Sequence, residues 1–195
     1  MTINRNKTKE LVFHRPNPRL YLPPHPLLDI ERVTCIKLLG VYFAETLTFE
    51  EHVKYLLTLC NQRLYLLKTF CSQGMFAQHL NAVYHSLIVS RLSYALPTWG
   101  GFLTKDLINK IDAFFMKTLK YGYANNLADF NSLLAKTDLT LFNSLHNSSH
   151  CLNFLLPPEK TLSVSLRNAS YELPRYFYKL FRNSFIVRTL YDRAY

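Results

Sequence analysis

The sequence predicts a mainly α protein in which a short β-hairpin precedes a bundle of helices. Three observations predict this fold class. Apolar residues recur at helical spacing from residue 53 onward, strand-like runs are confined to the first 43 residues, and five prolines lie between those runs. Apolar residues make up 49% of the chain, which is enough to build a hydrophobic core.

Two segments near the N-terminus have the composition of β-strands. Residues 9–13 form a short apolar run, and residues 33–43 are rich in β-branched and aromatic side chains. The prolines between them each fix φ and remove a backbone donor, so we predict a loop or the turn of a hairpin there. Gly40 lies inside the second run, where glycine marks a bulge or the close approach of another backbone.

The first helix is predicted to begin at a capping box and to end at a glycine. Thr48 and Glu51 have the spacing at which a threonine hydroxyl accepts from the third helical amide and the glutamate reaches back. Apolar side chains then follow at helical spacing as far as residue 67. Gly74 is the residue type that most readily ends a helix.

Two further amphipathic helices follow. One is predicted from about Phe76 to about Ser93, ahead of Pro97 and the Gly100–Gly101 pair. The other is predicted to be capped by Thr104 and stopped by Gly122. None of the three helices can bury its apolar stripe alone, so they should pack together as a small bundle.

The last 70 residues carry weaker signals. Leucines over residues 125–156 suggest more helix, which ends at Pro157 and Pro158. From Lys160 onward, seven basic and two acidic residues are interleaved with tyrosines and phenylalanines. We therefore predict a helical, basic and aromatic segment at the C-terminus.

The formal net charge of +10 favours a polyanionic partner. The positive charges are spread along the chain and form no compact lysine or arginine run. The sequence has no signal-peptide pattern at its start and no stretch of 18 apolar residues. The expectation is a soluble, intracellular protein without a membrane partner.

No catalytic or metal-binding motif is present in the sequence. A polymerase site needs two aspartates close together to hold two Mg²⁺ ions, and no two of the six aspartates are adjacent. His146, His150 and Cys151 lack the second ligand pair that a zinc site requires. We predict no catalytic residue, no metal site and no cofactor for this chain.

Several short motifs in a fixed order carry a resemblance to a known family. They begin with residues 3–13 (INRNKTKELVF), a proline-bearing connection, and residues 37–41 (KLLGV). Residues 91–95 (RLSYA) with Trp99–Gly100 follow, and then residues 166–168 and 182–185. This order resembles the C-terminal part of the reverse transcriptases encoded by non-LTR (LINE-like) retrotransposons, a class of transposable element.

The resemblance implies a division of the chain. Residues 1–45 would be palm-end strands with a primer-grip-like turn, residues 46–122 a thumb-like helical bundle, and residues 123–195 a C-terminal segment. The fingers, most of the palm and the catalytic aspartates of such an RNA-directed DNA polymerase would lie upstream of Met1. We therefore expect a fragment that cannot polymerise alone, and Mg²⁺ is expected only in the longer parent enzyme.

The resemblance also suggests which residues contact nucleic acid. Lys7 matches the lysine that helps to neutralise the leaving pyrophosphate, and the turn around Gly40 matches the primer grip. The predicted partner is an RNA/DNA template-primer, held by phosphate contacts. The predicted nucleic-acid-binding residues are Lys7, Lys9, Lys37, Gly40, Lys110, Lys117 and Lys120. The alternative is a helical protein-interaction module without a nucleic-acid function.

Overall fold

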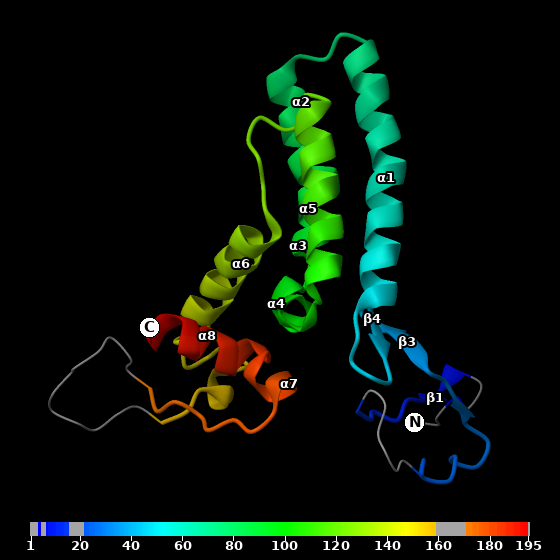
Figure 1. Ribbon diagram of the computed structural model, residues 1–195, viewed down its shortest axis with the longest axis vertical. Helices are drawn as coiled ribbons and strands as arrows, with labels where there is room; N and C mark the ends of the chain where they lie inside the picture. The colour runs from blue at the N-terminus through cyan, green and yellow to red at the C-terminus, as the bar shows by residue number, and fades with distance from the viewer. Residues whose placement is uncertain (1–3, 5–6, 16–21, 159–170, 195) are drawn as a thin grey trace, which may run out of the picture.

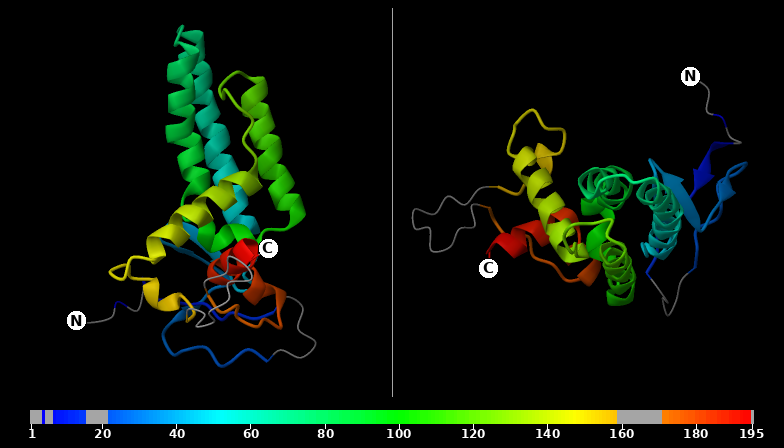
Figure 2. Two further views of the ribbon diagram at one scale, coloured as in Figure 1. Left: turned by 90° about the vertical axis from the view of Figure 1, so that its left-hand side faces the viewer. Right: turned by 90° about the horizontal axis from the view of Figure 1, so that it is seen from above.

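The computed structural model describes residues 4, 7–15, 22–158 and 171–194, and it confirms the mainly α fold with a short β-hairpin (Figure 1). The motif at residues 166–168 and part of the proline-rich connection lie outside the described residues. Three long helical stretches form an upright bundle, and α6 (Phe130–Leu145) crosses its lower end. Figure 2 shows that the hairpin and α6 lie on opposite sides of this bundle.

The hairpin lies within the segment that was predicted to be a single strand. Strand β3 (Cys35–Leu38) pairs antiparallel with β4 (Val41–Ala44), and Leu39 and Gly40 form the two-residue turn. Both turn residues have positive φ, 47° and 90°, as a type I′ turn requires. The expected single strand over residues 33–43 is therefore wrong, because Gly40 allows the chain to reverse where a bulge was expected.

The first predicted strand is shorter than expected and has a different partner. Strand β1 (Lys9–Glu10) pairs in parallel with β2 (Glu31–Arg32), across the proline-rich connection. The Arg32 Nε atom donates to the Glu10 carboxylate at 2.8 Å and supports this pair. Pro23, Pro24 and Pro26 thus lie in the connection between parallel strands, and the tight turn lies further along the chain.

Helix α1 (Glu50–Ser72) begins without the predicted capping box. The N-cap residue is Phe49, and the Thr48 hydroxyl instead hydrogen-bonds the Thr46 hydroxyl at 3.0 Å. Phe49 is buried, with ring centroids 5.7 Å from Phe43 and 5.8 Å from Phe102. Burial of this aromatic side chain fixes where the helix starts and overrides the local capping signal.

The predicted helix ends are confirmed at two glycines. Helix α1 ends before Gly74 and α5 (Lys105–Lys120) before Gly122, and both glycines have positive φ. At each end the amides of the glycine and of the residue after it donate to carbonyls of the last helical turn, as in a Schellman motif. The predicted cap at Thr104 is also confirmed, since its hydroxyl accepts from the Leu107 amide at 3.4 Å.

The connection from α1 to α5 is largely helical and is interrupted after Ser93. Helix α2 (Ala77–Tyr84) passes into a π-helical turn, η2 (His85–Val89), and then into α3 (Ser90–Ser93). After Ala95, which has a positive φ, α4 (Leu96–Trp99) and the 3₁₀ turn η3 (Gly100–Phe102) lead to α5. The shared core includes buried side chains from every long helix of the bundle: Leu56, Cys60, Leu67, Leu80, Tyr84, Ile88, Leu92, Trp99, Ile111 and Phe115.

The C-terminal segment builds a second, smaller core. After α6, this segment contains the 3₁₀ turn η4 (Asn153–Leu155), α7 (Lys179–Arg182) and α8 (Phe185–Ala194). Phe142, Leu145, Tyr171 and Leu190 form this core, whereas Phe130 at the start of α6 belongs to the core of the bundle. Helix α6 therefore joins the two cores.

A buried ion pair attaches α8 to the rest of the protein. The Arg188 guanidinium donates to both carboxylate oxygens of Asp138 on α6, each at 2.9 Å. It also donates to the carbonyls of Asn183 and Pro97, at 2.6 and 3.3 Å. A Cβ atom on Gly101 would overlap this guanidinium, so only glycine leaves space for Arg188 there.

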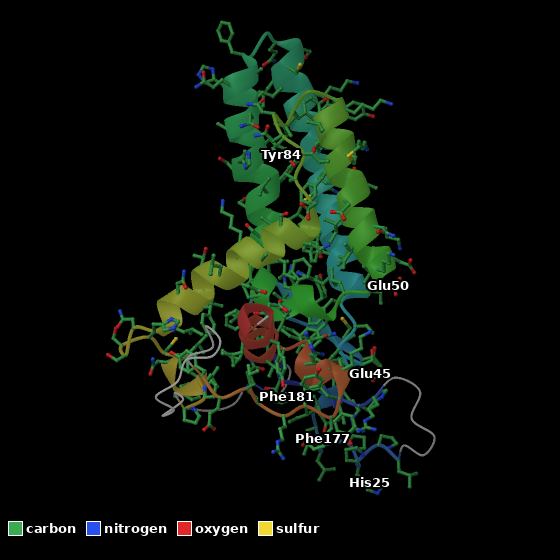
Figure 3. All side chains as sticks on the ribbon, turned by 60° about the vertical axis from the view of Figure 1, so that its left-hand side comes forward. His25, Glu45, Glu50, Tyr84, Phe177 and Phe181 are labelled. Carbon is green, nitrogen blue, oxygen red and sulfur yellow. The ribbon has the colours of Figure 1, made fainter. Side chains whose placement is uncertain are left out.

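The N-terminal and C-terminal segments meet at the lower end of the molecule, where Figure 3 shows His25, Phe177 and Phe181. The Arg15 guanidinium lies 4.4 Å from the centre of the Tyr178 ring. Several large apolar side chains remain exposed in this region, including Phe13, Leu27, Leu28 and Phe177. In the described part of the chain, no helix has both the length and the apolar character needed to cross a membrane.

Candidate nucleic-acid interface

A cavity of about 320 Å³ opens where the hairpin turn meets α1 and α3. The turn supplies its floor, the first half of α1 supplies one wall, and the end of α3 with Tyr94 supplies the other. We call this the turn pocket; its lining residues are Lys37, Leu39, Gly40, His52, Tyr55, Leu56, Leu59, Arg91 and Tyr94. The motif that resembles a primer grip thus forms part of a concave site.

Lys37 projects from β3 toward two tyrosine rings. Its ammonium donates to the Tyr55 hydroxyl at 3.0 Å and lies 4.3 Å from the centre of that ring. It also lies 5.2 Å from the Tyr42 ring. The hydrogen bond to Tyr55 raises the pKa of Lys37 and lowers the pKa of the Tyr55 hydroxyl, so the lysine stays charged at neutral pH.

Two arginines add positive charge to the same region. Arg91 lines the turn pocket from α3, and Arg63 on α1 donates to the Leu87 carbonyl at 3.0 Å. Leu87 lies in the π-helical turn, where backbone hydrogen bonds depart from the α pattern. The hydrogen bond from Lys37 is the largest cause of the lowered pKa of Tyr55, and the charges of Lys37, Arg91 and Arg63 lower it further; Arg63 lies one helical turn beyond the pocket residue Leu59 and does not line the pocket.

These three cations have no acidic partner among the described residues. The ion pairs in this part of the chain join Lys9 to Glu31, His14 to Glu45, Arg32 to Glu10 and Arg188 to Asp138. Like charges gathered without carboxylates repel one another and destabilise the folded chain slightly. A bound anion would relieve that repulsion, and phosphate is a group that both arginine and lysine bind well.

The turn itself is held in place by Tyr94. The Tyr94 hydroxyl donates to the Leu39 carbonyl at 2.9 Å and so connects the hairpin to the end of α3. The Tyr94 carbonyl in turn accepts from the Trp99 indole at 3.1 Å. A Cβ atom on Gly40 would lie 3.3 Å from the Tyr94 ring, so glycine permits both the turn and this close approach.

His52 forms the inner end of the turn pocket and is almost completely buried, with 1% of its surface exposed. The Tyr42 amide donates to its Nδ1 atom at 3.4 Å, and its ring packs edge-on against Trp99 with centroids 4.9 Å apart. Burial, with a smaller effect from the Lys37 charge, lowers the pKa of His52 from 6.5 to about 4. The imidazole is therefore neutral at pH 7, with its proton on Nε2.

This buried histidine predicts a pH dependence of stability. The unfolded chain binds a proton at His52 below pH 6.5, whereas the folded protein resists protonation until about pH 4. The stability contributed by neutral His52 is complete above pH 6.5 and is lost as the pH falls toward 4. We expect the free energy of unfolding to fall by about 2 kcal/mol between pH 7.5 and 5.

The measurement is urea denaturation at several pH values on the wild-type protein, a His52→Gln variant and a His79→Gln control. His79 is exposed on α2, so its replacement should leave the slope unchanged, whereas His52→Gln should flatten it. Equal slopes in the wild type and His52→Gln would show that His52 is not the titrating group.

The structure brings only some of the predicted site residues together. Lys37 and Gly40 share the turn pocket. Lys7 lies in a short turn near Asn4, and Lys9 forms its ion pair with Glu31 beside the parallel strands. These two lysines therefore lie on the β1–β2 side of the hairpin, apart from the pocket.

The three lysines of α5 lie away from the turn pocket. Lys110, Lys117 and Lys120 are exposed, and Lys117 donates to the Asn61 side chain on α1 at 3.3 Å. Asn61 comes two residues after the pocket residue Leu59, so it lies about 200° around α1 from it. Lys117 and the turn pocket consequently contact different faces of α1.

Sequence reasoning missed the residues that complete the pocket. The pocket residues Tyr55 and Leu59 are four residues apart on α1, with Arg63 four residues further on outside the pocket, and Arg91 and Tyr94 are three apart on the other wall. This spacing predicts one helical face in each case. The stronger apolar periodicity of these helices indicated only the face that packs in the core, so this second face was not predicted.

Three of the aspartates in and around α5 and α6 have structural roles. Asp112 accepts from the Phe130 amide at 2.7 Å, Asp129 caps α6 by accepting from the Ser132 amide, and Asp138 binds Arg188. Within the described residues no three histidine, cysteine or acidic side chains come together to hold a metal ion. Comparisons of this chain with protein-family models, curated proteins and solved structures found no match.

Proposed function

We propose that this chain is the palm-end and thumb part of a reverse transcriptase of the non-LTR (LINE-like) retrotransposon kind, and that it binds a template-primer through the turn pocket. The observation that carries the proposal is that Lys37 and Arg91, which have no acidic partner among the described residues, line one pocket with the Gly40 turn, while Arg63 lies one helical turn further along α1. The order of the sequence motifs supports the same assignment. Polymerisation itself would require the aspartates and Mg²⁺ of a longer parent enzyme.

Binding would follow from charge and shape. Lys37 and Arg91 in the pocket, and Arg63 beside it on α1, can each contact one phosphate of a nucleic-acid backbone, which gives affinity without sequence preference. Gly40 lets the Tyr94 ring pack closely against the turn, which brings this ring next to Lys37 and Arg91 in the pocket. Tyr94 holds the turn against α3 and keeps these groups in one arrangement.

The first test is the salt dependence of binding. We expect the full chain to bind an RNA–DNA hybrid, with an affinity that falls roughly 40-fold between 50 and 200 mM salt if three phosphates are neutralised. Fluorescence anisotropy with a labelled hybrid measures this directly. An affinity that does not change with salt would contradict a phosphate-led interface.

The second candidate is a helical protein-interaction module. One feature favours it: an apolar groove of about 530 Å³ between the α3–α4 region and α6. Val89, Pro97, Leu133 and Leu141 line this groove, and serine, threonine and Lys136 side chains surround it. If the hybrid does not bind at any salt concentration, this module becomes the better account of the chain.

A further inference from the structure

We infer that the turn pocket accepts a single unpaired base, which stacks on the Tyr94 ring, so that the protein prefers nucleic acid with an unpaired nucleotide at its end. This inference rests on the proposed nucleic-acid binding. It adds a chemical preference that phosphate contacts alone cannot supply, because phosphates are the same in paired and unpaired strands.

The Tyr94 ring is placed to act as a stacking surface. About 54% of the residue is exposed, and the ring lines the pocket. Its hydroxyl is already engaged by the Leu39 carbonyl, so the part of the side chain left for a ligand is the aromatic ring itself. The same hydrogen bond fixes the ring orientation, which reduces the entropy lost when a base stacks on it.

The other aromatic rings of the pocket are already occupied. Lys37 lies over the Tyr55 ring, whose edge also meets Tyr42 with centroids 5.1 Å apart. The buried His52 ring packs against Trp99. For Tyr94, by contrast, the described part of the chain supplies neither a ring partner nor a cation over its face.

Polar groups at the pocket suit the edge of a base. The Lys37 ammonium and the Tyr55 hydroxyl lie together, and both can donate to base oxygen and nitrogen acceptors. Arg91 is exposed at the same opening and can contact the adjoining phosphate. A volume of about 320 Å³ is at the lower end of the range for sites that enclose one small molecule, and a duplex cannot enter it.

The backbone around Tyr94 is strained in a way that fits a binding role. Leu39 and Ala95, at the two ends of the Tyr94 contact, are non-glycine residues with φ of 47° and 51°. Leu39 is also 84% exposed, so packing of its side chain does not compensate for the strain. Strain of this kind is often concentrated at binding sites, where it holds a fixed arrangement of ligand contacts.

The test compares two hybrids that carry the same number of phosphates. Each has one unpaired nucleotide at each end of the DNA strand: adenine nucleotides in the first hybrid and abasic nucleotides in the second. We expect the full chain to bind the first about tenfold more tightly, since one base–aromatic stack is worth roughly that factor. Tyr94→Phe keeps the ring but loses the hydrogen bond that fixes it, so we expect this variant to retain most of the ratio.

Tyr94→Leu should bring the ratio close to one while binding to the abasic hybrid persists. Tyr65→Leu is the control, because it removes an exposed ring on α1 outside the pocket and should leave the ratio unchanged. A ratio near one in the wild type, or a ratio that survives Tyr94→Leu, overturns the stacking inference. If neither hybrid binds, the proposed function fails as well, so the two failures can be told apart.

Discussion

Replacing Arg188 with leucine is expected to lower the free energy of unfolding by about 3–5 kcal/mol, since it leaves a buried carboxylate without its partner. The Asp138 and Arg188 side chains are each only 9% exposed. Burial raises the pKa of Asp138, and Arg188 opposes this through its charge and its two hydrogen bonds. Without the arginine, Asp138 must take up a proton or remain charged in an apolar site.

A double variant separates the effect of the ion pair on stability from the effect of the volume that the two side chains fill. Arg188→Leu with Asp138→Leu removes both charges, and we expect it to recover much of the lost stability, because apolar replacement of a whole buried pair is often neutral. Urea denaturation of the two variants and the wild type measures the difference. If the single and double variants are equally unstable, the ion pair is not what attaches α8.

Neutralising Lys37 and Arg91 in the turn pocket together with the neighbouring Arg63 is expected to weaken binding to an RNA–DNA hybrid on the order of 100-fold, at about 1 kcal/mol for each lost contact. The variant replaces Lys37, Arg63 and Arg91 with glutamine. None of these side chains is buried, so the fold should persist, although Arg63 loses its hydrogen bond to the Leu87 carbonyl. Urea denaturation of this variant and the wild type checks that the two are equally stable, so that the loss of affinity reflects the lost contacts.

The lysines of α5 provide a control with the same change in charge. Replacing Lys110, Lys117 and Lys120 with glutamine also removes three positive charges, but from a helix that does not line the turn pocket. The sequence predicted that these lysines contact nucleic acid, and that prediction is still open. We expect a loss of less than about threefold, the size of a long-range charge effect screened by salt. A larger loss here than in the pocket variant would place the interface on α5.

The sequence predicted the bundle well because its signals are local. Gly74, Gly122 and Thr104 fix helix ends through backbone geometry within a few residues, and the apolar spacing identified the core faces. The capping box predicted at Thr48 was wrong because the start of α1 depends on Phe49, which packs against Phe43 and Phe102. A capping motif cannot reveal a tertiary contact of that kind.

Only part of the candidate site could be predicted from the sequence, because the rest depends on tertiary contacts. Lys37 and Gly40 belong to one short motif, so the sequence identified both. Arg63 and Arg91 lie 28 residues apart, and their approach depends on how α1 packs against the stretch that contains the π-helical turn. That turn rotates the residues after it relative to a regular α-helix, which no helical-period argument anticipates.

The most direct test of the proposed interface is the slope of log affinity against log salt for an RNA–DNA hybrid, measured for the wild type and for the Lys37, Arg63 and Arg91 variant. If these side chains each neutralise one phosphate, the slope should become shallower by about two to three. Equal slopes in the two proteins would show that the phosphates are bound elsewhere, and the turn pocket would no longer be the candidate nucleic-acid interface.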